Sequence, residues 1–137
     1  MFRGLLFSGL SKRFSYWPAV LLTTGLFGVI HLFNIISTGA VGESILQAFL
    51  AFFSGALYLA IRLSLGSIIP AIIFHLLWDW VALLAPTAPT TPEQFSLWDL
   101  LGFVAVAKPL VFGILGFWVL WRIKRHLDAD TSSTPAN

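Results

Sequence analysis

The sequence predicts an all-α protein, a polytopic bundle of about four transmembrane helices with both ends in the cytoplasm. Three observations support this fold class. The 137 residues are 58% hydrophobic and only 10% charged, whereas soluble domains carry roughly a quarter charged residues. The mean hydropathy is +0.88. The apolar residues form four long runs, and most basic residues lie outside these runs.

Each apolar run is long enough, or nearly so, to cross the hydrocarbon core, which takes about 20 mostly apolar residues in a helix. We expect the spans at residues 17–36, 44–61, 67–84 and 97–121. The second and third runs are short, so they predict tilt or burial among neighbouring helices. Because the backbone must satisfy its own hydrogen bonds inside hydrocarbon, runs of this length predict helices and not barrel strands.

The basic residues predict the orientation of the spans. They precede the first run, lie between the second and third runs, or follow the fourth: Arg3, Lys12, Arg13, Arg62, Arg122, Lys124 and Arg125. The other two connections, 37–43 and 85–96, contain neither lysine nor arginine. Since positive residues gather on the cytoplasmic side, four spans with both ends in the cytoplasm agree with every connection.

The chain is expected to form one membrane domain over residues 1–126, followed by a disordered polar tail at 127–137. A net charge of +2 without a basic stripe argues against nucleic acid as a partner. The chain has no cysteine, which excludes disulfides and thiolate metal sites. The first residues lack the unbroken apolar run and cleavage site of a signal peptide. The expected surroundings are the lipid bilayer.

Two histidines and an aspartate lie inside these apolar runs. His31 belongs to the first span, and His75 and Asp79 belong to the third. Ionisable groups in a span are costly and usually face a bundle interior or a water-filled cavity. Residues four apart share a helix face, so Phe27 accompanies His31 and Asp79 accompanies His75. The two histidines and Asp79 are the candidates for function, whereas Phe27 is expected to pack.

Two imidazoles and a carboxylate are a familiar set for zinc, and a carboxylate that is not a ligand can orient an imidazole. A bound metal would polarise a carbonyl and lower the pKa of a water. Spacing alone leaves another interpretation open, in which each imidazole hydrogen-bonds across helices. Upright packing would also separate the imidazoles in depth by about 8 Å, at about 1.5 Å per residue, unless helix tilt closes the gap.

Three other polar residues of the runs are expected to have structural roles. Asn34 predicts a hydrogen bond at a helix end, with a place in the same cavity as His31 as the alternative, and Gln47 predicts a hydrogen bond between helices. Lys108, which precedes Pro109 in the fourth run, is expected to snorkel towards the interface. The alternative for Lys108 is a contact with a substrate carboxylate or with Asp99.

Three segments also match the motifs of a known family. FGVIH at 27–31 has the pattern Phe-x-x-x-His, and HLLWD at 75–79 has the pattern His-x-x-x-Asn or Asp in its less common Asp form. FRGLLFSGLSKRF at 2–14 is similar to the segment around the arginine of a Glu-Glu-x-x-x-Arg motif, with Arg3 in the arginine's place. Over residues 1–85 the chain thus resembles the CPBP intramembrane metalloproteases. These include the type II CAAX prenyl endopeptidases and the bacterial ABI group linked to bacteriocin self-immunity.

The resemblance implies a metal-dependent endopeptidase that is a multi-pass protein of the prokaryotic plasma membrane. Its substrate would be a peptide or a membrane protein, cleaved near the membrane face. His31 and His75 would bind zinc or another divalent metal, or polarise the nucleophilic water and the scissile carbonyl. Asp79 would orient His75 or stabilise the oxyanion indirectly. Arg3 would pair with an acidic group of the site, with a topology or lipid-headgroup charge as the alternative.

The register set by Arg3 would put the family's paired glutamates just before Met1. Glu43 and Glu93 are expected in loops on the outer side of the membrane, where they cannot replace the pair. We therefore expect an N-terminally clipped version of a longer protein, with little or no proteolytic activity as it stands. Two other functions stay open. One is a non-catalytic membrane or bacteriocin-immunity-type protein that binds a peptide, and the other is a small transporter whose histidines relay protons.

Overall fold

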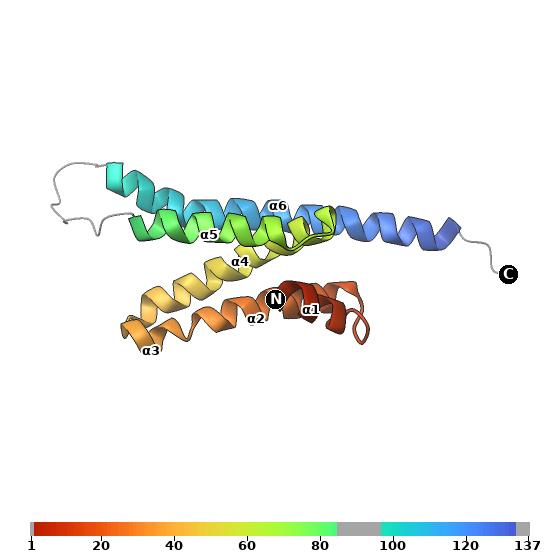
Figure 1. The fold of residues 1–137 in the computed structure, drawn as a ribbon, viewed down its shortest axis with the longest axis horizontal. Coiled ribbons are helices and arrows are strands. Elements are labelled where there is room, and N and C mark those ends of the chain that lie inside the picture. The colour runs from red at the N-terminus through yellow and green to blue at the C-terminus, as the bar shows by residue number, and fades with distance from the viewer. Residues whose placement is uncertain (1, 85–96, 134–137) are drawn as a thin grey trace.

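The computed structural model describes the backbone of residues 2–84 and 97–133 and the side chains of residues 5–80 and 107–132. Every element in the described part of the chain is a helix, which confirms the all-α class (Figure 1). The helices in chain order are α1 (Phe2–Leu10), α2 (Tyr16–His31), α3 (Asn34–Thr38), α4 (Val41–Leu65), α5 (Ile69–Leu84) and α6 (Leu97–Ser133).

The helices coincide with the apolar runs. The first run forms α2 and the short α3, and each later run lies within or largely within one helix. Two described stretches, Tyr16–Thr38 and Val41–Leu65, are long and apolar enough to cross a membrane by length and composition, and Ile69–Trp80 is a shorter apolar helix. The number of four spans and the cytoplasmic position of both ends stay predictions.

Helix α4 is the central helix of the described bundle, with α2 packed against it and α6 packed against it as well. Glycines allow the backbones to come close. A Cβ on Gly28 would lie 2.8 Å from the carbonyl oxygen of Ala48, and a Cβ on Gly113 would lie 2.5 Å from the Cβ of Phe53. Both distances are too short for a real side chain, so these two helix contacts require glycine.

Two further glycines end helices. Gly39 after α3 and Gly66 after α4 have φ angles of +68° and +66°, in the left-handed region that a residue without a Cβ adopts most easily. Only a few residues separate the neighbouring helices at both positions, and the chain reverses direction there. As a result, α4 returns beside α2, and α5 returns beside α4.

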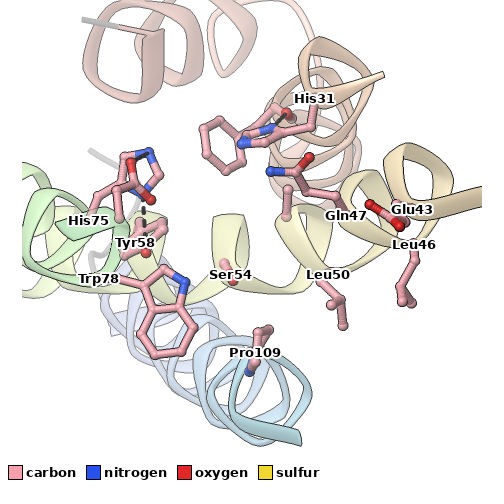
Figure 2. Close-up of a pocket in the computed structure, with 13 residues that line it drawn as sticks. His31, Glu43, Leu46, Gln47, Leu50, Ser54, Tyr58, His75, Trp78 and Pro109 are labelled. Atoms are coloured by element: carbon pink, nitrogen blue, oxygen red, sulfur yellow. Dashed lines mark hydrogen bonds and ion pairs between the residues drawn. The ribbon is translucent and has the colours of Figure 1, made fainter. Parts of the chain in front are cut away.

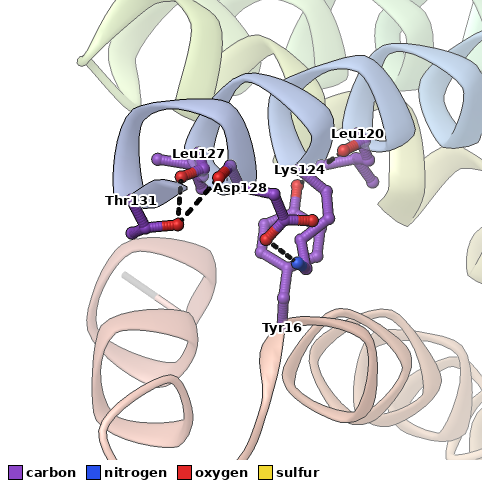
Figure 3. Close-up of polar contacts among 6 residues, drawn as sticks. All are labelled: Tyr16, Leu120, Lys124, Leu127, Asp128 and Thr131. Atoms are coloured by element: carbon purple, nitrogen blue, oxygen red, sulfur yellow. Dashed lines mark hydrogen bonds and ion pairs between the residues drawn. The ribbon is translucent and has the colours of Figure 1, made fainter. Parts of the chain in front are cut away.

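The buried core lies where α1, α2, α4 and α6 meet. It consists of Phe7, Ala19, Val20, Ala56, Leu59, Ala60 and Leu120. Beside it, the hydroxyl of Tyr16 donates a hydrogen bond to the carbonyl oxygen of Leu120 at 2.9 Å, which ties the start of α2 to α6 (Figure 3). This end of the bundle is therefore well packed, whereas α3 lies far from α5 and α6 at the other end (Figure 1).

The outer faces of the helices are apolar. On α2, large side chains such as Leu21, Leu26 and Val29 are exposed, and on α6 the same holds for Val111 and Ile114. A soluble monomer rarely exposes so much apolar surface. The surface is therefore what lipid-facing helices require.

The predicted disordered tail at 127–137 is wrong for its first part, because α6 continues to Ser133. Polar contacts along the helix support this extension (Figure 3). The ammonium of Lys124 pairs with the carboxylate of Asp128 one turn later. The hydroxyl of Thr131 donates to the carbonyl oxygens of Leu127 and Asp128, at 3.2 and 2.8 Å. Residues 134–137 lie outside the described part of the chain.

Candidate active site

A pocket of about 290 Å³ lies among α2, α4, α5 and α6. Its lining includes His31, His75 and Asp79, three of the four residues that the sequence singled out. Figure 2 shows His31 and His75 entering from different helices, with Tyr58 of α4 next to His75. A volume near 300 Å³ is at the lower end of the range for ligand pockets, about 300–1,000 Å³. The structure thus places the two motif histidines around one cavity.

Phe27 connects the two histidines. The centroid of its ring lies 4.7 Å from that of His31 and 5.8 Å from that of His75, in edge-on contacts on both sides. The phenylalanine of the Phe-x-x-x-His pattern therefore packs against both imidazoles and forms part of the pocket wall. Upright helices would separate the two imidazoles in depth, but in the structure both imidazoles line the same cavity.

His31 is the last residue of α2, where the helix tightens. The backbone N–H groups of Leu32 and Phe33 bond to carbonyl oxygens three residues back, at 3.0 and 3.2 Å. Nδ1 of His31 lies 2.8 Å from the carbonyl oxygen of Phe27. Because a carbonyl oxygen only accepts, Nδ1–H is the donor, and Nε2 of the neutral ring carries a lone pair.

His75 has a protein neighbour at each ring nitrogen. Nε2 lies 3.6 Å from a carboxylate oxygen of Asp79, one turn further along α5. Nδ1 lies 3.4 Å from the hydroxyl oxygen of Tyr58 (Figure 2). A carboxylate accepts and does not donate, so the Asp79 side favours a proton on Nε2 of His75. The two histidines therefore differ in the ring nitrogen that bears the proton.

Sequence reasoning missed Tyr58. It lies in the apolar run of the second span and belongs to none of the three motifs. The one available signal was rarity, because the chain has only two tyrosines and Tyr58 is the one inside an expected span. In the structure it is 3% exposed, and its ring packs against those of Phe27, Phe74 and His75.

The expectation that Glu43 lies in a loop is wrong. Glu43 belongs to the first turn of α4 and lines the same pocket as the histidines. Gln47, one turn later, also lines the pocket, and its side-chain oxygen accepts a hydrogen bond from Nδ2 of Asn34 at 2.7 Å. This confirms the interhelical hydrogen bond expected of Gln47. The sequence missed Glu43 because the helix begins earlier than the apolar run. Glu93 lies outside the described residues.

Lys108 contacts aromatic rings from α5. Its ammonium lies over the indole ring of Trp78 and within 5.5 Å of the ring centroid of Phe74. The ring of Phe112, on its own helix, is at 5.8 Å. Such cation–π contacts contribute about 0.5–2 kcal/mol. Trp78 lines the pocket, so the cation–π contact of Lys108 connects α6 to a residue of the pocket wall.

Two predicted contacts fall outside the described side chains. Arg3 lies in α1, but its side chain is not among those described. The same holds for Asp99 in α6. The pairing of Arg3 with an acidic group and that of Lys108 with Asp99 therefore stay predictions.

The described donors do not fit a zinc site on their own. Catalytic zinc takes three protein ligands, and within the described ranges no group of three or more His, Asp or Glu side chains could hold a metal ion. Nε2 of His31 carries a lone pair, but both nitrogens of His75 have protein neighbours. Zinc held by His31 and His75 stays a proposal that requires a further ligand.

The family model described as type II CAAX prenyl endopeptidase Rce1-like matches residues 1–81. The chain belongs to this family. The match covers α1 to α4 and most of α5. Both histidines and the residues that contact their rings therefore lie within it: Phe27, Tyr58 and Asp79. Membership of the Rce1-like family makes the chain a membrane-embedded member of a protease family. Neither a curated protein nor a solved structure matches it.

Proposed function

We propose that this Rce1-like chain is an intramembrane endopeptidase whose pocket receives a peptide bond between His31 and His75. The observation that carries the proposal is the single cavity lined by both motif histidines and Asp79. Family membership supports the same reaction class. The geometry supports peptide hydrolysis in particular because the two imidazoles offer one proton acceptor and one proton donor.

The hydrogen bonds support a division of roles between the histidines. Nδ1–H of His31 is engaged with the carbonyl oxygen of Phe27, so Nε2 is the atom that accepts a proton from an attacking water. Nε2–H of His75 faces Asp79 at 3.6 Å, longer than a hydrogen bond. We propose that a scissile carbonyl oxygen entering the pocket accepts from this N–H, which stabilises its developing charge.

The pocket wall supports an apolar peptide segment as substrate. Beside the histidines, α4 contributes Leu46, Leu50 and Ala51, and α6 contributes Pro109. Glu43 and Gln47 line the pocket as well and offer polar contacts to the peptide backbone. We propose a peptide or membrane-protein substrate that is cleaved while it lies against the bilayer.

The test is cleavage of a lipid-anchored, internally quenched peptide by the chain in nanodiscs. It uses the 137-residue chain and a version with one helical turn, carrying Glu-Glu in the register set by Arg3, added before Met1. Because α1 and α2 are consecutive, separated by a short connection and packed on each other, we infer that they run antiparallel. An added turn therefore extends along α2 in the direction of Phe27.

We expect the extended chain to cleave the peptide. His31→Ala and His75→Ala should each lower its rate by about 10²-fold or more, the usual contribution of general acid–base groups. The matched control is His126→Ala, because His126 is the third histidine and lies on α6 away from this pocket. Cleavage that survives both pocket substitutions, or its absence in both versions, would contradict the proposal.

The same proteins distinguish the alternatives. A chain that binds the peptide at the pocket without cleaving it would be a peptide-binding protein of the immunity type. A proton flux in liposomes that depends on His31 and His75 would indicate a transporter. The peptidase is preferred because protease chemistry is what the matched family supports.

A further inference from the structure

We infer that Tyr58 is a positioning residue of the site. Its hydroxyl donates a hydrogen bond to Nδ1 of His75 and holds the imidazole with Nε2–H directed to Asp79. The catalytic consequence rests on the proposed peptidase function, but the hydrogen bond itself does not. None of the three motifs includes Tyr58, which comes from the helix between the two that carry the histidines.

The first step is the proton on His75. The carboxylate of Asp79 lies 3.6 Å from Nε2. An ionised carboxylate can only accept, and a lone pair on Nε2 would be repelled by it. Nε2 therefore carries the proton. In a neutral ring this leaves the lone pair on Nδ1.

The second step is the direction of the Tyr58 hydrogen bond. A phenol hydroxyl can donate or accept, and here it lies 3.4 Å from Nδ1. Because Nδ1 holds a lone pair, the hydroxyl is the donor. Tyr58 is 3% exposed, so this hydrogen bond is shielded from water.

The third step compares the two neighbours of His75. The side chain of Asp79 is 51% exposed, and solvent weakens the electrostatic interactions of an exposed carboxylate. Tyr58 is fixed on the central helix, with its ring centroid 6.0 Å from that of Phe74 and 6.4 Å from that of Phe27. A buried, tightly packed hydroxyl orients a ring better than an exposed carboxylate does. Tyr58 is thus the stronger of the two anchors.

The test is ¹⁵N NMR of the histidine-labelled full chain in nanodiscs. With only three histidines, the His75 signals are assigned by their loss in His75→Gln. Two-bond ¹H–¹⁵N couplings report which ring nitrogen bears the proton. We expect these couplings to show the Nε2–H form of His75 in the unmodified chain. This measurement needs no variant of Tyr58.

Tyr58→Phe removes the hydroxyl and keeps the buried ring. We expect the Nδ1 resonance of His75 to shift to that of a nitrogen without a donor, and a mixture of tautomers to appear. The chain supplies its own control in Tyr16→Phe, since the only other tyrosine hydroxyl bonds to the carbonyl oxygen of Leu120. That control should leave the His75 spectrum unchanged. An Nδ1–H or doubly protonated His75 in the unmodified chain, or an unchanged Nδ1 resonance in Tyr58→Phe, would overturn the inference.

A kinetic measurement connects the hydrogen bond to the reaction. In the version of the chain with the added Glu-Glu turn, Tyr58→Phe should lower kcat about tenfold and leave KM unchanged, as expected when an orienting partner is lost. Because the spectra do not depend on cleavage, a chain that cleaves nothing contradicts the proposed function alone. An unperturbed kcat together with a shifted Nδ1 resonance would overturn the positioning role.

Discussion

The chemistry proposed for the pocket depends on two hydrogen bonds to imidazole rings. In His31, Nδ1–H donates to the carbonyl oxygen of Phe27, and in His75, Nδ1 faces the hydroxyl of Tyr58. The two imidazoles thus present different groups at Nε2, a lone pair in His31 and an N–H in His75. The four-residue spacing predicted that Phe27 and Asp79 share faces with the histidines, and the structure confirms it. The spacing could not predict Tyr58, because that contact joins two helices.

Substitution of Asp79 tests how the carboxylate acts. Asp79→Asn retains a side-chain oxygen that faces Nε2–H of His75, so we expect the cleavage rate of the extended chain to fall by less than about tenfold. Asp79→Ala removes the acceptor and should cost about 10–100-fold, the usual effect of losing an orienting group. Both rates come from the quenched-peptide assay. Equal losses in the two variants would show that His75 needs the negative charge of Asp79, and that an uncharged oxygen facing Nε2 does not replace it.

Metal analysis tests the donor set. The described residues provide no group of three His, Asp or Glu side chains around a common point, and catalytic zinc needs three ligands. We therefore expect the purified 137-residue chain to hold much less than one equivalent of zinc, measured by mass spectrometry of the metal content. One equivalent that is lost in His31→Ala and in His75→Ala, and kept in His126→Ala, would refute this expectation.

At the scale of helices, the sequence predicted the runs well and their ends less well. The spans expected at 44–61 and 67–84 lie within or largely within α4 and α5. The break after His31 was not predicted, because neither glycine nor proline marks it. The start of α4 at Val41, which brings Glu43 into the pocket, was also missed. Hydropathy locates the apolar part of a helix, whereas polar first and last turns extend beyond it.

Close packing of α4 against its neighbours makes a prediction about stability. Gly113→Ala places a Cβ 2.5 Å from the Cβ of Phe53, so helix α6 must move away. We expect a loss of about 1–3 kcal/mol, as in other overpacked contacts, seen as a lower thermal midpoint in detergent. Gly25→Ala is the matched control, since nothing lies within 4 Å of its added Cβ. A midpoint for Gly113→Ala equal to that of the control would contradict the close approach of α4 and α6.

For the molecule as a whole, composition predicted the membrane class, and family membership supports it. The meeting of α2 and α5 at one pocket was beyond sequence reasoning. The depth of each histidine in the bundle depends on the tilt of its helix. The gap between the two imidazoles is filled by a side chain, that of Phe27, which contacts both histidines. Counting residues along upright helices gives the wrong impression of two separate sites.

The topology is directly testable because the chain contains no cysteine. Single substitutions Ser11→Cys and Ser132→Cys should react with a membrane-impermeant maleimide only after the cells are opened. Ser37→Cys and Thr90→Cys should react in intact cells. This pattern follows from four spans with both ends in the cytoplasm. Labelling of Ser132→Cys but not of Ser11→Cys in intact cells would instead indicate an odd number of spans.

The central claim is that His31 and His75 act together in one pocket. A double-mutant cycle on peptide cleavage by the extended chain tests it most directly, with His31→Ala, His75→Ala and the double variant. Groups that act as a unit are strongly non-additive. We predict that the double variant cleaves no more slowly than the slower single variant. Losses that multiply in the double variant would show that the histidines act independently and would contradict a shared site.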